Sequence, residues 1–276
     1  MLVATVLALC VAVLHASWNL LVKQSEDRHL ALWGQFTIAG VACGIGLIMW
    51  TAIDGPPDVA WQWAIVSGAM HVPYIVLLSR AYNRGDFSMS YPIVRGAGAL
   101  AGALGGILIL NDSPSAVSMI GVILVISGVL ILARAGSWHV ISAALAVSAT
   151  IGIYTVVDAH GARESQPIGY SMALLVCAAF FTTAWTLGTK RGLMIAALKR
   201  NARTMSGAAL ASTIAYTLVL IAVRRAPVGY VAALRESSVV IAAFAGWKML
   251  DEGDHRRRIA SAIIVFVGLV VLVAGG

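Results

Sequence analysis

Three ionisable residues stand inside long apolar stretches of the chain, where a charge is costly. Arg95 lies in residues 87–110, and Arg235 and Glu236 lie in residues 228–249. A charged side chain at the centre of a bilayer costs roughly 2.5–3.5 kcal/mol on insertion scales, so it should face a partner or a polar cavity. The planar arginine fork binds carboxylates through paired hydrogen bonds. The two arginines therefore predict either recognition of an anionic group on a ligand or ion pairs that hold helices together.

The carboxylates in these stretches suggest proton chemistry. Glu236 is deep in its stretch, which makes it a candidate proton carrier, and the alternative is a structural counter-ion to Arg95 or Arg235. Asp158 is near the end of another apolar stretch, where it either contributes to coupling or is simply solvated. Tyr154 precedes Asp158 by one helical turn and shares its face.

Polar and aromatic side chains recur at helical spacing and predict the walls of a binding site. His15, Trp18 and Asn19 are three and four residues apart, so they share one helix face, as do His71 and Tyr74. The alternative is that such faces pack against neighbouring helices. The candidates for substrate binding are His15, Trp18, Asn19, His71, Tyr74, Tyr91, Arg95, Tyr154, Ser212, Tyr216 and Arg235, and those for proton coupling are Glu236 and Asp158.

No cofactor is expected from these residues. Two histidines without a third ligand do not predict a metal site. The chain has no Gly-x4-Gly-Lys-Ser/Thr loop, so ATP is not expected as the direct energy source.

The elements that must position these residues are membrane-spanning helices. The chain of 276 residues is 60% apolar and only 11% charged, against roughly 25% charged in soluble proteins. This composition excludes a soluble domain, a disordered chain and a nucleic-acid-binding module, and the unbroken apolar runs exclude the alternation of a β-barrel. We expect an all-α integral membrane protein with ten transmembrane helices, at residues 2–22, 31–52, 61–80, 87–110, 116–134, 138–158, 168–188, 205–223, 228–249 and 258–274. The longest connection is expected between residues 189 and 204.

A weak internal repeat appears at an offset of 140 residues. It places Arg95 on Arg235 and Gly128 on Gly268, and it aligns residues 110–112, Leu-Asn-Asp, with residues 250–252, Leu-Asp-Glu. We therefore expect two five-helix halves, residues 1–136 and 137–276. Because five is odd, the second half would be inverted in the membrane, a design that places a transporter's site near the midplane.

The distribution of basic residues predicts the orientation. Of the 19 Lys and Arg residues, fourteen follow the odd-numbered spans and three follow the even-numbered ones. The positive-inside rule therefore places the odd loops in the cytoplasm and both termini in the periplasm.

Three motifs resemble the drug/metabolite transporter superfamily, and its bacterial EamA type in particular. They are His-Ala-Ser-Trp-Asn at 15–19, Ser-Tyr-Pro-Ile-Val-Arg-Gly-Ala-Gly at 90–98 and Leu-Arg-Glu-Ser-Ser at 234–238. The resemblance implies a ten-helix carrier of small metabolites in the bacterial inner membrane, often an exporter, with a cavity lined by helices 1, 3, 4, 6, 8 and 9. The family usually has both termini in the cytoplasm, and the charge count departs from that arrangement.

The predicted function is secondary transport, as export or exchange, of a small polar or zwitterionic metabolite such as an amino acid. One alternative is export of drug-like or organic cations coupled to protons through Glu236. An intramembrane enzyme and a channel are weaker alternatives, because neither protease motifs nor a selectivity filter is present. The expected partners are the metabolite and the lipid bilayer, with no nucleic acid. The almost wholly apolar spans 116–134 and 258–274 should face lipid or form a homodimer interface.

Overall fold

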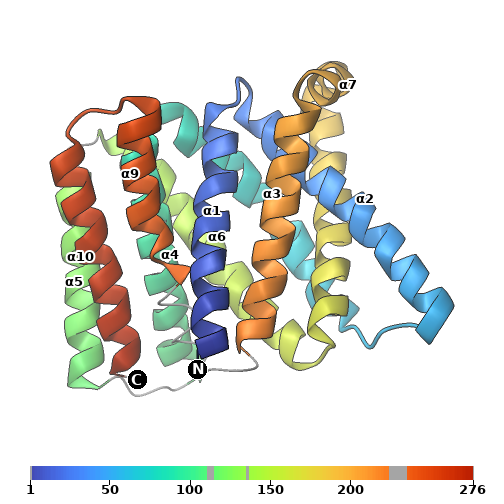
Figure 1. The fold of residues 1–276 in the computed structure, drawn as a ribbon, viewed down its shortest axis with the longest axis horizontal. Coiled ribbons are helices and arrows are strands. Elements are labelled where there is room, and N and C mark those ends of the chain that lie inside the picture. The colour runs from blue at the N-terminus through green and yellow to red at the C-terminus, as the bar shows by residue number, and fades with distance from the viewer. Residues whose placement is uncertain (1, 111–114, 135–136, 224–234, 276) are drawn as a thin grey trace.

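The computed structural model describes residues 2–110, 115–134, 137–223 and 235–275, and all regular structure within them is helical. Figure 1 shows the helices standing side by side in one bundle. They are α1 (Leu2–Gln24), α2 (Arg28–Asp54), α3 (Trp61–Arg84), α4 (Phe87–Leu110), α5 (Ala116–Ala133), α6 (Trp138–Arg163), α7 (Pro167–Val223), α9 (Ser238–Leu250) and α10 (His255–Ala274).

Several of these helices can cross a bilayer by length and apolar composition. Among the described residues the stretches are Val6–Gln24, Arg28–Asp54, Trp61–Arg84, Trp138–Ala162 and Pro167–Val219. Two shorter apolar helices, Met119–Leu132 and Ser238–Leu250, accompany them. The protein is therefore a multi-pass, all-helical membrane protein.

The main departure from the predicted spans is α7, which contains two of them. The connection expected at residues 189–204 is largely helical, and only Lys190 and Asn201 leave helical dihedral angles. Residues 191–200 are rich in Leu, Met, Ala, Lys and Arg, which are strong helix formers even outside the bilayer core. In Figure 1 the chain rises in the first arm of α7 (residues 167–189), turns over and returns in the second arm (residues 202–223).

The predicted ninth span is described only in part. It was expected at residues 228–249, whereas the described helix α9 begins at Ser238, after the helical residue Arg235 and a turn at residues 236–237. Part of the expected span lies outside the described residues. The count of ten helices and the inverted repeat therefore stay predictions.

The helices divide into a central group and two edges. Helix α2 packs on α7 at one edge, and α5 and α10 pack on each other at the opposite edge (Figure 1). Helices α1, α3, α4, α6, α7 and α9 lie between these edges. Exposed apolar side chains cover the edges, including Ile45 and Ile48 on α2 and Ile120 and Ile123 on α5, as expected of helices that face lipid.

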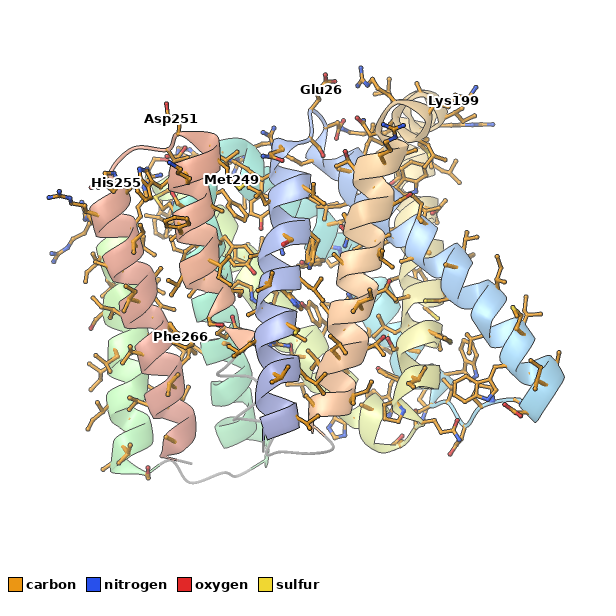
Figure 2. The ribbon with its side chains drawn as sticks, viewed as in Figure 1. Glu26, Lys199, Met249, Asp251, His255 and Phe266 are labelled. Atoms are coloured by element: carbon orange, nitrogen blue, oxygen red, sulfur yellow. The ribbon has the colours of Figure 1, made fainter. Side chains whose placement is uncertain are left out.

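The two ends of the bundle differ in character. Both chain ends lie at one end (Figure 1), whereas Glu26, Lys199 and Asp251 lie at the other (Figure 2). At this second end the Glu252 carboxylate accepts hydrogen bonds from the backbone N–H groups of Phe87 and Ser88, at 2.5 and 2.7 Å. A carboxylate at this position satisfies the free donors at the start of α4. It therefore helps to position the helix that carries Arg95.

Candidate functional site

A buried ion pair joins α4 to the turn before α9. The Nε atom of Arg95 donates a hydrogen bond to Oε2 of Glu236 at 3.0 Å, and Nη2 donates a second one to Oε1. The two side chains are only 8% and 1% exposed. This is the two-fold geometry in which a guanidinium grips a carboxylate. The pair ties together positions 141 residues apart in the sequence.

Arg235 joins this pair from the helical residue that directly precedes Glu236. Arg235 is helical, whereas Glu236 and Ser237 form the turn that precedes α9, so the expectation that Glu236 lies within a helix is corrected. Neighbouring side chains on a helix diverge by about 100°, whereas here, where the turn begins after Arg235, Nε of Arg235 approaches Oε1 of Glu236 at 3.3 Å. Glu236 is thus the counter-ion of both arginines.

The three side chains leave one positive charge uncompensated within the group. Arg95 uses two donors on Glu236 and is buried, whereas Arg235 makes one longer contact among the described residues and is 21% exposed. A guanidinium has five N–H donors, so Arg235 retains donors for another acceptor. We call Arg95, Arg235 and Glu236 the arginine cluster.

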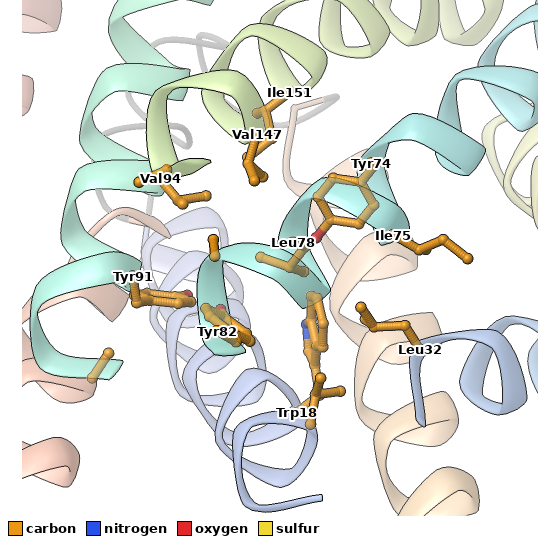
Figure 3. Close-up of a cluster of buried hydrophobic side chains, with 14 of the residues drawn as sticks. Trp18, Leu32, Tyr74, Ile75, Leu78, Tyr82, Tyr91, Val94, Val147 and Ile151 are labelled. Atoms are coloured by element: carbon orange, nitrogen blue, oxygen red, sulfur yellow. The ribbon is translucent and has the colours of Figure 1, made fainter. Parts of the chain in front are cut away.

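Aromatic side chains from four helices surround the arginine cluster. The rings of His15 on α1, Tyr74 on α3, Tyr91 on α4 and Tyr154 on α6 all lie close enough to interact with the charge of Arg95. Figure 3 shows Tyr74 and Tyr91 within one buried region between these helices. The fold therefore brings together four candidates that the sequence places on separate segments.

Two of these side chains, Tyr74 and Tyr154, form a compact group with His71. The ring of His71 stacks on Tyr154 with centroids 5.0 Å apart, and Tyr74 meets each of them edge-on at 5.7 Å. His71 Nδ1 lies 2.7 Å from the backbone oxygen of Ser67. We call His71, Tyr74 and Tyr154 the aromatic group.

On the helix face predicted on α1, Asn19 links two helices, whereas Trp18 keeps an unpaired polar atom among the described residues. Asn19 accepts a hydrogen bond from the Tyr82 hydroxyl at 2.6 Å and donates to the backbone oxygen of His15 at 2.8 Å, so it links α1 to α3. Trp18 is buried, as Figure 3 shows, and its Nε1 donor has no partner among the described residues. Tyr82 continues the helix face of His71 and Tyr74 in the sequence, although it was not among the candidates for substrate binding.

Asp158 is buried, which corrects the expectation that it could be merely solvated. It is 8% exposed, and the Tyr170 hydroxyl donates a hydrogen bond to Oδ1 at 3.1 Å. The hydroxyls of Ser67 and Tyr216 also interact with this carboxyl group, at geometry outside a good hydrogen bond. Of these neighbours, the sequence identified only Tyr216. Ser67 carries the helical-spacing signal, because it lies four residues before His71.

Two glycines allow this arrangement. A Cβ atom on Gly161 would collide with the ring of Tyr170, so the missing side chain lets that ring lie against α6. A Cβ on Gly68 would fall 2.6 Å from Cβ of Cys177, so α3 and α7 approach closely beside Ser67. The tyrosine and serine hydroxyls thereby reach Asp158.

Several buried polar atoms around these groups lack partners among the described residues. They are Trp18 Nε1, Ser67 Oγ, Tyr91 Oη, Tyr216 Oη and Ser238 Oγ. Tyr91 and Ser238 interact, but their hydroxyls do not form a good hydrogen bond. Buried polar groups in folded proteins are normally satisfied. Their concentration here is what a site for a polar ligand requires.

Ser212 stands apart from this arrangement. Its hydroxyl donates to the backbone oxygen of Ala209 at 3.1 Å, within its own helix. Within the part of the chain that the structure describes, no group of three His, Cys, Asp or Glu side chains could hold a metal ion.

Membrane-spanning helices that bury charged and polar side chains are typical of proteins that move substrates, ions or protons across a membrane. Residues 138–274 match the model of the EamA-like transporter family. Over these residues the chain belongs to this family, which is part of the drug/metabolite transporter superfamily.

Solved structures support the same fold. A structure described as "Crystal structure of protein" superposes with a TM-score of 0.62 over 97% of this chain and 95% of its own. The two sequences are 15% identical, so this likeness concerns the fold alone. No curated protein sequence matches the chain.

Proposed function

We propose that the protein is a secondary transporter of a small metabolite that carries a carboxylate, such as an amino acid, and that it works by alternating access around the arginine cluster. The observation that carries the proposal is the buried group of two arginines and one glutamate, with its excess positive charge. Charges inside a membrane protein are expensive and mark substrate pathways.

The charge balance favours a carboxylate in the substrate. Arg235 retains hydrogen-bond donors and interacts only weakly with Glu236, so a substrate carboxylate can accept from Arg235 and neutralise the excess charge. Arg95 holds Glu236 in place and becomes a second contact when the substrate carboxylate displaces Glu236. A substrate with only positive charge would add to the excess, which weighs against organic cations.

The aromatic group suits the remainder of the substrate. His71, Tyr74 and Tyr154 present ring faces and edges, which bind an aliphatic or aromatic side chain and also attract an ammonium group. The partnerless atoms Trp18 Nε1 and Tyr91 Oη supply further polar contacts. A zwitterion with a small side chain uses all three kinds of contact.

The contacts of Glu236 bear on how transport is driven. Two guanidinium groups touch it, and these contacts favour the counter-ion interpretation over the proton-carrier one. We propose export or exchange across a bacterial inner membrane, with the end of the bundle that carries Glu26, Lys199 and Asp251 in the cytoplasm. The apolar outer faces of α5 and α10 fit contact with lipid or with a second copy in a homodimer.

A thermal-shift screen on the purified protein tests the substrate class, because a ligand that binds the folded state raises the melting temperature. Three matched series serve as probes: amino acids, their amides, which lack the carboxylate, and the corresponding decarboxylated amines. The melting temperature should rise with at least one amino acid and remain unchanged with its amide and its amine.

Two variants place the effect at the arginine cluster. Arg235→Gln should abolish the shift while the protein stays folded, whereas Arg80→Gln, at an exposed position on α3, should keep it. A shift that is equal for the acid and the amide, or that survives in Arg235→Gln, would contradict carboxylate recognition at this site.

A further inference from the structure

A second buried polar group lies beside the aromatic group and is chemically unlike the arginine cluster. Asp158 is one helical turn beyond Tyr154 on α6 and is 8% exposed. Within the described ranges no basic side chain forms an ion pair with it, whereas Glu236 contacts two arginines. The two buried carboxyl groups therefore differ in their surroundings: Glu236 is paired with cations, and within the described part of the chain Asp158 is not.

The groups that face Asp158 from the packed helices are neutral hydroxyls. Helix α6 packs against α3, α4 and α7. The Tyr170 hydroxyl donates a hydrogen bond to Asp158 at 3.1 Å, and the hydroxyls of Tyr216 and Ser67 lie near the same carboxyl group. Tyr154 also interacts with Asp158 and connects it to further titratable groups. The ring of His71 on α3 stacks on the ring of Tyr154, and the Tyr154 hydroxyl interacts with the charges of Arg95, Arg235 and Glu236.

These surroundings suit a carboxyl group that changes its protonation state. An ionised carboxylate without a cation is strongly disfavoured in an apolar interior, and the protonated acid avoids that penalty. A hydroxyl can donate to a carboxylate and can also accept from the O–H of a carboxylic acid. Tyr170 can therefore bond to Asp158 in both states, and the hydroxyls of Tyr216 and Ser67 lie near the same carboxyl group.

We propose that Asp158 is a proton-binding site, held by the hydroxyl of Tyr170, with the hydroxyls of Tyr216 and Ser67 close by, and separate from the arginine cluster. One carboxylate oxygen takes up a proton from water when the site opens to one side of the membrane. The same O–H bond breaks when the site opens to the other side, and the proton returns to water there. Proton binding itself does not depend on the identity of the metabolite, whereas its use to drive transport rests on the function proposed above.

Infrared spectroscopy of the full-length protein tests the site, with the proton itself as the probe. The C=O stretch of a protonated carboxyl group is separate from the bands of carboxylates, so a pH titration reports proton binding without any substrate. Wild type should show such a band that disappears as the pH rises. Asp158→Asn should lose this change, and Glu26→Gln, which removes a carboxylate that is 75% exposed, should retain it. A change of full size in Asp158→Asn would overturn the proposal.

A second pair of variants keeps the test decisive if Asp158→Asn does not fold. Tyr170→Phe removes a hydroxyl that donates to the carboxylate, so the midpoint of the infrared titration should rise by about one pH unit. Tyr82→Phe removes a buried hydroxyl bonded to Asn19 and should leave the midpoint unchanged. Equal midpoints in the two variants and wild type would overturn the assignment to Asp158. Because no substrate is added, this result is independent of the metabolite proposal.

Discussion

Glu236 is the shared partner of two arginines, so its replacement should destabilise the protein more than replacement of Arg95. In Glu236→Gln, Arg95 stays buried with no counter-ion, and Arg235 loses its contact as well. In Arg95→Gln, the remaining carboxylate keeps Arg235 at 3.3 Å. The two halves of one ion pair should therefore differ in their mutational cost.

The expected sizes follow from the burial of the pair. Removing one partner of a buried ion pair costs about 3–5 kcal/mol, because the other charge is left uncompensated. We expect Glu236→Gln near the upper end of that range and Arg95→Gln at its lower end or below. The double variant has two amides that can bond to each other, so its loss should be smaller than the sum of the single losses by about 2 kcal/mol.

Denaturant unfolding in detergent micelles, followed by tryptophan fluorescence, measures these free energies. The matched control is the pair of Glu26 and Arg200, whose side chains are 75% and 65% exposed and whose coupling should be close to zero. Additive losses for Arg95 and Glu236, or a larger loss for Arg95→Gln than for Glu236→Gln, would refute the shared counter-ion.

Four further outcomes are expected. Glu252→Gln should lower the free energy of unfolding by about 1 kcal/mol, because a charged cap at the start of α4 is lost; unchanged stability in denaturant would show that the cap contributes nothing. Gly161→Ala should cost about 1–3 kcal/mol because its Cβ meets the ring of Tyr170, and a protein as stable as wild type would contradict that contact. Burial alone would raise the pKa of Asp27, but hydrogen bonds from Lys190 and from a backbone N–H hold it below its ordinary value of 3.8. Its contribution to stability is therefore present above pH 3.8 and lost as the pH falls through the lower folded-state value, so wild type should lose melting temperature there more steeply than Asp27→Asn, and parallel curves would argue against the pair. If the end that carries Glu26, Lys199 and Asp251 is cytoplasmic, the C-terminus lies in the periplasm, so a C-terminal alkaline phosphatase fusion should be active and a GFP fusion dark. The reverse pattern would show the usual family orientation.

Much of the fold follows from the composition and length of the apolar stretches. Apolar runs of about 20 residues predict spanning helices, and the described helices α1 to α6 and α10 fall where they were expected. The structure of the segment at 189–204 was harder to predict. Its charged residues indicate exposure to water, and exposure does not exclude a helix. Its Leu, Met and Ala residues were the signal for helical structure.

The candidate site shows which features a sequence pattern leaves open. The depth of Arg95 and Glu236 predicted that each needs a partner, but their pairing depends on a turn before α9 that apolar periodicity does not reveal. Asp158 stood at the end of an apolar run, where burial and exposure produce the same pattern. Its burial comes from Tyr170 and Tyr216 on α7, and such contacts between distant segments arise only in the folded chain.

Counterflow in proteoliposomes tests the central claim most directly, which is that this chain carries a carboxylate-bearing metabolite. Liposomes are loaded with an unlabelled amino acid that gives a thermal shift, and uptake of the labelled form is measured with no ion gradient. A carrier should show transient accumulation that the amide of the same amino acid does not support, and Arg235→Gln should abolish it. Equal uptake with or without internal amino acid, or equal counterflow with the amide, would contradict the account.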